Sequence, residues 1–267
     1  MTIDARLAEL IPNLPETLFQ AARYALLSPG KRFRARLTLS CCKSFGAPES
    51  LALDPACALE IVHTYSLIHD DLPCMDNDDF RRGQPSLHKV YGDAIALLTG
   101  DFLLTYAFEI LGQVPTFSAE QKLSLVQTLA KAAGAQGMLG GQVLDMESTG
   151  RRIGAEALLT MHRGKTAALF SAALQFGRIA ADAPPSFSSA LQALGDDVGL
   201  AFQFLDDLQD EDDLAKEKPN ALALFGKEGT LQRLLELKHS IERALQKLPS
   251  QGAPIALLLK ETLWMQF

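Results

Sequence analysis

Two acidic clusters, each at the end of a long apolar segment with helical spacing, constrain the fold of this chain more than any other feature. They occupy residues 70–76 (DDLPCMD) and 206–210 (DDLQD). The C-terminal end of a helix carries partial negative charge, so aspartates at that end are electrostatically unfavourable. Both clusters are explained if divalent cations lie between them and hold a polyphosphate, because Mg²⁺ prefers carboxylate, water and phosphate oxygens. The pattern therefore predicts two long helices that end at a shared metal and phosphate site.

The rest of the chain has the apolar periodicity of helices rather than of strands. Apolar residues recur at spacings of three and four, and most prolines fall between these periodic segments. Strand alternation and the Asn-Gly or Asp-Gly pairs of tight hairpins are absent. The expected fold class is therefore all-α, a single large bundle of about ten helices, with residues 1–267 forming one domain. We expect these helices over residues 4–11, 16–27, 31–46, 55–71, 91–113, 119–147, 155–181, 187–212, 227–247 and 253–265.

Composition excludes several classes of function. The chain has 267 residues and a net charge of −7, which does not favour a nucleic-acid partner. Its four cysteines form no Cys-x-x-Cys pair, so we expect reduced thiols rather than disulfides or a zinc site. No signal peptide and no uninterrupted run of about 18 apolar residues is visible, which predicts a cytoplasmic protein without a membrane span. Segment 94–111 is apolar on more than one side, which indicates a central helix or an interface with a second copy.

Basic residues lie close in sequence to the acidic clusters or at predicted helix starts. Residues 30–34 (GKRFR) open a predicted helix, where backbone N–H groups favour an anion. Residues 81–83 (RRG) follow the first cluster directly. Residues 162–166 (HRGKT) form a turn-like stretch that is not a P-loop, because the upstream glycine and the preceding strand are missing. Together these groups predict a site that holds an anionic substrate between metals and cationic side chains.

Six strings in a fixed order make the chain similar to a known family. It resembles the trans-type polyprenyl diphosphate synthases, in particular the bacterial farnesyl and geranylgeranyl diphosphate synthases. The resemblance implies an isoprenoid synthase fold, a helical bundle around a central prenyl-binding cavity, and a homodimer. The strings that carry it are residues 30–34 (GKRFR), 61–76 (IVHTYSLIHDDLPCMD), 81–83 (RRG), 140–142 (GGQ), 162–166 (HRGKT) and 202–210 (FQFLDDLQD).

The resemblance also implies a role for individual residues. Three Mg²⁺ ions around an allylic diphosphate would be held by Asp70, Asp71, Asp76, Asp206, Asp207 and Asp210. Direct contacts to that diphosphate would come from Arg81 and Lys165. The diphosphate of the second substrate, isopentenyl diphosphate, would be bound by Lys31, Arg34, His63 and Arg82. The reacting carbons would be lined by Thr166 and Gln203, with Phe202 over the homoallylic chain.

The implied reaction is prenyl transfer without a side-chain nucleophile. Metal ions and cationic side chains stabilise the departing diphosphate, and the double bond of isopentenyl diphosphate attacks the allylic cation. Tyr65 and Ser66 lie five and four residues before Asp70, about 6–7.5 Å down the helix, a rise comparable to one isoprene unit. An aromatic residue at position 65 resembles the signature of a C15 product, farnesyl diphosphate. Geranylgeranyl diphosphate is the alternative, because residues 74–79 (CMDNDD) also resemble synthases of the C20 chain.

The similarity weakens after Asp210. Relatives carry a Gly-Lys step, an aspartate-containing loop and a second lysine there, whereas this chain continues with residues 211–222 (EDDLAKEKPNAL). Lys216 or Lys218 is expected to replace a missing diphosphate contact. A shorter segment over the site leaves a second reading open, a weakly active or non-catalytic subunit that binds a prenyl diphosphate.

Overall fold

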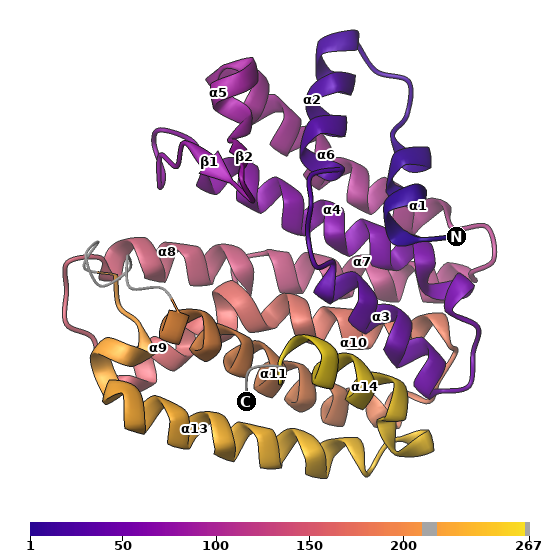
Figure 1. Ribbon diagram of the computed structural model, residues 1–267. Helices are drawn as coiled ribbons and strands as arrows, with labels where there is room; N and C mark the ends of the chain where they lie inside the picture. Colours follow the sequence, from indigo (N-terminus) through magenta and orange to yellow (C-terminus); the bar gives the residue numbers. More distant parts are fainter. Residues whose placement is uncertain (210–217, 265–267) are drawn as a thin grey trace.

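The structure, a computed structural model, describes residues 1–209 and 218–264, and it confirms the predicted all-α fold (Figure 1). A two-residue hairpin, β1 (Phe80–Arg81) with β2 (Gln84–Pro85), is the sheet structure of the described part of the chain. The α-helices are α1 (Ile3–Leu10), α2 (Glu16–Leu26), α3 (Phe33–Ser44), α4 (Leu53–Asp70), α5 (Leu87–Tyr91), α6 (Asp93–Gln113), α7 (Ala119–Ala133), α8 (Met138–Ser148), α9 (Ala155–His162), α10 (Ala168–Ala180), α11 (Ser188–Gln209), α13 (Ala221–Leu245) and α14 (Ala253–Thr262).

Helices α4 and α10 form the centre of the bundle. Residues 55–62 of α4 and 169–177 of α10 are buried without interruption, as expected for helices covered on all sides. Helix α3 packs against both, α6 packs on α4, and α11 packs between α10 and α13. Glycines allow the closest of these contacts: a Cβ at Gly195 would lie 2.4 Å from the Cα of Ser171. This packing brings the C-terminal ends of α4 and α11 to one side of the core.

Helix α6 differs from the expectation of a central helix. It contacts α4 along its length, yet its outer face leaves Leu97 47% and Leu98 55% exposed. By length and composition alone, residues 49–70 and 93–113 could each cross a membrane; 67% of the first apolar window is buried inside the protein, and 39% of the second. The first is therefore a core helix of the bundle, and the apolar outer face of α6 needs a separate explanation.

Two helices differ from their predicted ranges at glycines, and a hairpin that the sequence did not predict has a glycine in its turn. The helix expected over 119–147 divides into α7 and α8 around Gly134 and Gly137, because glycine is a poor residue for a helix interior. The helix expected over 227–247 begins earlier, at Ala221, and is broken at Gly226 with φ 68°. The hairpin has a two-residue turn of Arg82 and Gly83, both at positive φ, although the usual Asn-Gly or Asp-Gly pair is missing.

The stretch 162–166 is not a turn. Residues Arg163–Ala167 form a π-helical turn that continues α9 into α10. A π-turn inserts one extra residue into a helix and redirects the side chains around it, and such turns are frequent at functional sites. Gly141 of α8 allows the close approach, because a Cβ there would lie 2.0 Å from the backbone nitrogen of Lys165.

Candidate functional site

A cavity of about 600 Å³ lies between the ends of α4 and α11, the start of α3, the hairpin and the π-turn. It brings together most of the residues that the sequence singled out, from segments far apart in the chain. Those that line it are Arg34, His63, Tyr65, Ser66, Asp70, Arg81, Arg82, Lys165, Thr166, Phe202, Gln203 and Asp206. The cavity has acidic groups on two helix ends, cationic groups beside them and apolar residues below.

The three aspartates of the first cluster have different surroundings. Asp70 lines the cavity, and its carboxylate makes no hydrogen bond or ion pair with any residue that the structure describes. Burial raises the pKa of Asp70 to about 6, against the opposing effect of Lys165. Asp76 folds back toward Asp70, since its backbone N–H donates to the Asp70 carbonyl oxygen at 2.9 Å, and its carboxylate pairs with Lys218 at 2.9 Å. Asp70 is therefore the member of this cluster that a buried cation would stabilise most directly.

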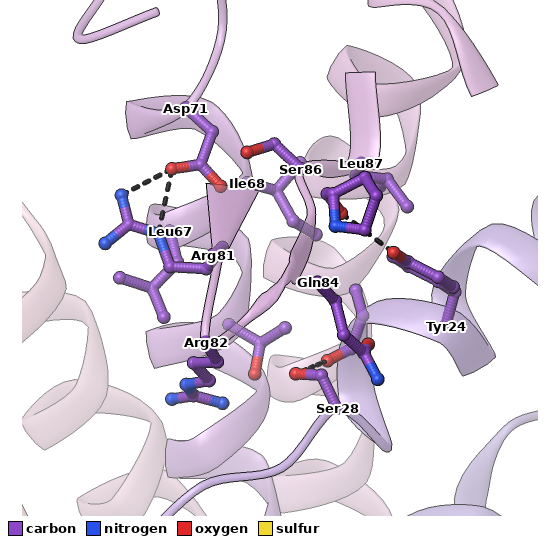
Figure 2. A pocket seen from close by; sticks show the side chains of 13 residues that line it. Tyr24, Ser28, Leu67, Ile68, Asp71, Arg81, Arg82, Gln84, Ser86 and Leu87 are labelled. Carbon is purple, nitrogen blue, oxygen red and sulfur yellow. Dashed lines mark hydrogen bonds and ion pairs between the residues drawn. The ribbon is translucent and has the colours of Figure 1, made fainter. Parts of the chain in front are cut away.

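The Asp71 side chain points away from the cavity and into the surrounding part of the same chain. It is buried and accepts two hydrogen bonds from Arg81, one of them from Nε at 2.9 Å (Figure 2). Arg81 also pairs with Asp78 at 3.1 Å. Figure 2 shows the small pocket of about 40 Å³ that Asp71, Arg81 and Arg82 share with Tyr24 and Ser86. Asp71 thus holds a cavity-lining arginine in place instead of facing the cavity itself.

The second acidic cluster divides in the same way. Asp206 lines the cavity, whereas Asp207 is 2% exposed and lies outside the set of lining residues. The two oxygens of Asp207 accept from the backbone N–H of Ala221 at 2.7 Å and from Gln203 Nε2 at 2.9 Å. Asp210 and Lys216 lie outside the described residues. The structure therefore brings Asp70 and Asp206 to one cavity and does not bring Asp71 and Asp207 to it.

The cationic side of the cavity consists of Arg34, Arg82 and the ring of His63. Arg34 lies over the Phe170 ring at 4.5 Å and near Phe202 at 5.8 Å, which is a cation–π arrangement. Burial lowers the pKa of Arg34 to about 10, and burial also lowers that of Arg82. Neither guanidinium forms an ion pair with a described carboxylate, so both have unused capacity to bind an anion.

His63 is neutral in these surroundings. Burial and the positive charges of Arg34 and Arg82 lower the pKa of His63 well below its ordinary value of 6.5. Its Nε2 lies 3.4 Å from Arg34 Nη1, where a neutral ring accepts the hydrogen bond.

Lys31 is exposed and precedes α3, which begins at Phe33; it does not line the cavity. The N-cap of α3 is Arg32, at φ 48°, whose buried guanidinium pairs with Glu60 at 3.0 Å. Arg32 therefore has a structural role, and the basic string at residues 30–34 contributes Arg34 to the cavity.

Lys165, Thr166 and Gln203 lie on the side formed by the π-turn. Lys165 pairs with Asp145 of α8. The Thr166 hydroxyl lies 2.7 Å from Gln203 Oε1, and the Gln203 amide nitrogen donates a hydrogen bond to Asp207. These contacts form a chain from the cavity wall to the start of α13 at Ala221.

Tyr65 is a buried aromatic residue that lines the cavity. Its side chain is 4% exposed, and its hydroxyl has no hydrogen-bond partner in the described structure. Burial raises the pKa of Tyr65 to about 12. Its ring lies edge-on to His69 at 5.7 Å, and Ser66 lines the cavity one residue further along α4. The Tyr65 ring is therefore a buried aromatic part of the cavity wall on the helix that ends at Asp70.

Sequence reasoning missed several lining residues. His69 lines the cavity and hydrogen bonds to the Leu97 carbonyl at 3.1 Å, where Gly100 leaves room for its ring. Gln142 and Met138 of α8 also line it. The glycine-rich string at residues 140–142 gave a signal for Gln142, but nothing local distinguishes Met138 or the pairing of Asp145 with Lys165.

The donor set fits a cation that takes most of its ligands from outside the protein. Within residues 1–209 and 218–264, no three His, Cys, Asp or Glu side chains are grouped closely enough to hold one metal ion. Asp70 and Asp206 instead contribute carboxylates to one cavity from the ends of two different helices. Mg²⁺ is commonly bound by one or two carboxylates together with water and substrate phosphates. The unpaired Asp70 carboxylate with its raised pKa is consistent with such a cation.

Comparisons with known proteins agree with this geometry. Residues 15–222 match the sequence model of the family described as polyprenyl synthetase. The chain is 37% identical over 270 residues to a farnesyl diphosphate synthase of Geobacillus stearothermophilus, an alignment that covers 95% of this chain and 91% of that protein. It is 42% identical over 234 residues to a chloroplastic geranylgeranyl pyrophosphate synthase of Catharanthus roseus, covering 86% of this chain and 66% of that one.

A solved structure has the same fold over almost the whole length. The apo crystal structure of an FPP/GFPP synthase from Zymomonas mobilis matches with a TM-score of 0.89 and 36% identity. The match covers 98% of this chain and 94% of that chain.

Proposed function

The chain belongs to the polyprenyl synthetase family and is a prenyltransferase of the farnesyl or geranylgeranyl diphosphate synthase type, and on that premise we propose that it joins isopentenyl diphosphate to an allylic diphosphate. The observation that carries the proposal is that acidic and cationic side chains line one cavity. Asp70 and Asp206 line it at two helix ends, and Arg34 and Arg82 line it without an ion pair to any carboxylate that the structure describes. A diphosphate on each side would complete this arrangement.

We assign the allylic diphosphate to the acidic side. Asp70 and Asp206, with Asp76 next to Asp70, would hold Mg²⁺, as we propose from the donor chemistry. When bound, Mg²⁺ would act as a Lewis acid on the departing diphosphate. Arg81 and Lys165 line the same side and supply positive charge to the leaving group.

The isopentenyl diphosphate is assigned to the cationic side. Arg34 and Arg82 would pair with its phosphate oxygens, and neutral His63 supports Arg34. Phe202 lies beside Arg34 and would cover the hydrocarbon part of this substrate. Lys31 is exposed outside the lining and could reach only a group at the mouth of the cavity.

The wall between the two sides would stabilise the allylic cation. Thr166 and Gln203 line the cavity with neutral oxygen dipoles, which would favour a nearby positive charge without placing a charged nucleophile beside it. The released proton would pass to the departed diphosphate, so no side chain is needed as a nucleophile.

We propose farnesyl diphosphate as the product, because the buried Tyr65 ring lines the cavity and lies five residues before Asp70, a helix rise comparable to one isoprene unit. The second candidate is geranylgeranyl diphosphate, favoured by residues 74–79 (CMDNDD), which resemble synthases of the C20 chain. We expect catalysis to use all six charged side chains of the cavity lining, whichever of the two products forms. Their presence argues against a subunit that only binds prenyl diphosphates. These side chains are Arg34, Asp70, Arg81, Arg82, Lys165 and Asp206.

One assay tests the proposed function. Purified protein with Mg²⁺, isopentenyl diphosphate and either dimethylallyl or geranyl diphosphate should form C15 products, with release of one diphosphate for each condensation. Product sizing by mass spectrometry would distinguish C15 from C20. A protein that binds both substrates but forms no new carbon–carbon bond would contradict the proposal and favour the non-catalytic reading.

We further propose a homodimer in which α6 packs against α6 of a second copy. The helix has a mean hydropathy of 1.6 in its apolar window, yet only 39% of that window is buried. Leu97 and Leu98 are exposed together on its outer face. Adjacent exposed leucines on an apolar helix are typical of protein interfaces.

Leu98→Glu is therefore expected to convert the dimer to a monomer, because it buries a charge at the interface. Sedimentation velocity on the wild type and the variant measures this directly. Leu235→Glu, at an exposed leucine of α13, is the matched control and should leave the mass unchanged. A wild type that sediments as a monomer would end the dimer proposal.

The proposed setting is a single domain in the cytoplasm. Helices α13 and α14 pack on α11 and α3, so the C-terminal part shares the bundle of the N-terminal part. Both proposed substrates are charged diphosphates that dissolve in water, so the reaction does not require a membrane.

A further inference from the structure

Asp207 has three polar neighbours from three different elements. Its oxygens accept from the Ala221 backbone N–H at the first residue of α13 and from Gln203 of α11. His162 Nε2, at the end of α9, lies 3.4 Å from Oδ2, and both side chains are buried. A carboxylate in these surroundings is already occupied by donors, and it does not line the cavity.

The contact with Asp207 fixes the orientation of the Gln203 amide. A carboxylate only accepts hydrogen bonds, so the group that Gln203 directs toward it must be its NH₂. The other end of the amide, Oε1, then faces Thr166 at 2.7 Å. Without Asp207, the two ends of this amide would be interchangeable.

The amide orientation in turn fixes the Thr166 hydroxyl. Because Gln203 Oε1 is an acceptor, the Thr166 hydroxyl must donate its proton to it. The lone pairs of Thr166 Oγ1 are then free for the cavity, whose wall includes both Thr166 and Gln203. An oxygen with exposed lone pairs stabilises a positive charge, whereas a hydroxyl proton pointing into the cavity would destabilise it.

We propose that Asp207 is a positioning residue: through Gln203 it turns the lone pairs of Thr166 toward the reacting carbons, and through Ala221 it ties this alignment to the start of α13. This inference rests on the proposed function, because it assumes an allylic cation at the cavity wall. It differs from the metal-ligand role that the sequence resemblance implies for Asp207. Asp206, one residue earlier, keeps that role.

The substitution Asp207→Asn tests the direction of the chain of hydrogen bonds. The backbone N–H of Ala221 cannot turn, so the asparagine oxygen must face it and the asparagine NH₂ must face Gln203. Gln203 then has to reverse, and its NH₂ turns the Thr166 proton into the cavity. We expect kcat to fall by about 10- to 100-fold, with KM for both substrates within about threefold of wild type.

A second substitution should restore the alignment. In Asp207→Asn with Gln203→Glu, the glutamate accepts from Asn NH₂ on one side and from the Thr166 hydroxyl on the other, with no change in net charge. We expect the double variant to recover at least about tenfold of the lost kcat, whereas Gln203→Glu alone places two carboxylates together and stays impaired. Recovery of this kind would not follow from a merely structural role.

Thermal unfolding without metal gives a readout independent of turnover. Asp207→Asn and Gln203→Glu should each lower the Tm, and the double variant should lie above both; Asp206→Asn is the matched control and should not show this coupling. If Asp207→Asn instead raises the Mg²⁺ requirement about tenfold or more, as expected for Asp206→Asn, and Gln203→Glu gives no rescue in either assay, the positioning role is wrong. A wild type without prenyl transfer overturns the proposed function, while the coupling in Tm still tests the hydrogen-bond chain itself.

Discussion

Asp70→Ala and Asp206→Ala are each expected to reduce kcat by about 10³-fold or more while the protein stays folded. Each of the two helix ends carries a pair of aspartates, and Asp70 and Asp206 are the members of these pairs that line the cavity. The proposed reaction needs cations beside the leaving diphosphate at this place. The fold should survive, because burial raises the pKa of Asp70 to about 6, which means that its ionised carboxylate is unfavourable in the metal-free protein. Steady-state rates with saturating Mg²⁺ and both substrates, beside a thermal melt, measure both effects.

The control for this pair of variants is Asp93→Ala. Asp93 is an exposed aspartate in the first turn of α6 and lines no part of the cavity, so its rate should stay within about twofold of wild type. Metal binding supplies a second check, since isothermal titration of Mg²⁺ together with a bisphosphonate should lose most of its heat in Asp70→Ala. Unchanged turnover in either cavity variant would remove the metal role from these carboxylates.

Tyr65→Ala is expected to shift the main product from C15 to C20 or longer. The Tyr65 ring is 4% exposed and lines the cavity, so its removal should enlarge the cavity on α4, five residues before Asp70. Loss of a buried aromatic side chain also destabilises the protein, by about 3 kcal/mol when the space stays empty. Gas chromatography of the dephosphorylated products reads out the chain length, and a melt records the stability.

Tyr65→Phe separates the ring from its hydroxyl. The hydroxyl has no hydrogen-bond partner in the described structure, so the phenylalanine variant should keep the C15 product and the Tm of the wild type. A C15 product from the stable Tyr65→Ala protein would mean that another residue sets the length. His69, whose ring packs on Tyr65 and against Gly100, would then be the next position to vary.

The apolar periodicity of the sequence predicted where the helices lie, but it did not predict where each of them begins and ends. Segments such as 16–27 and 187–212 match α2 and α11 within three residues, because a continuous apolar stripe has only one regular structure that buries it. The division of 119–147 at Gly134 depended on whether packing would compensate for a glycine in a helix, and the pattern carries no information on that. The π-turn at Arg163–Ala167 likewise forms where α8 approaches at Gly141, a contact between segments distant in sequence.

The two aspartate pairs show which properties of the site the sequence determined and which only the tertiary structure determined. From the residues alone came two helices ending in carboxylates, the basic partners and hence a shared metal and phosphate site, because these depend on residue types and spacing along the chain. Adjacent residues on a helix point about 100° apart, so two neighbouring aspartates can have different surroundings. Only the rotation of α4 and α11 within the bundle decided that Asp70 and Asp206 face it and that Asp71 and Asp207 bond to Arg81 and Gln203. That rotation is set by packing against α6, α10 and α13, which no local stretch of sequence encodes.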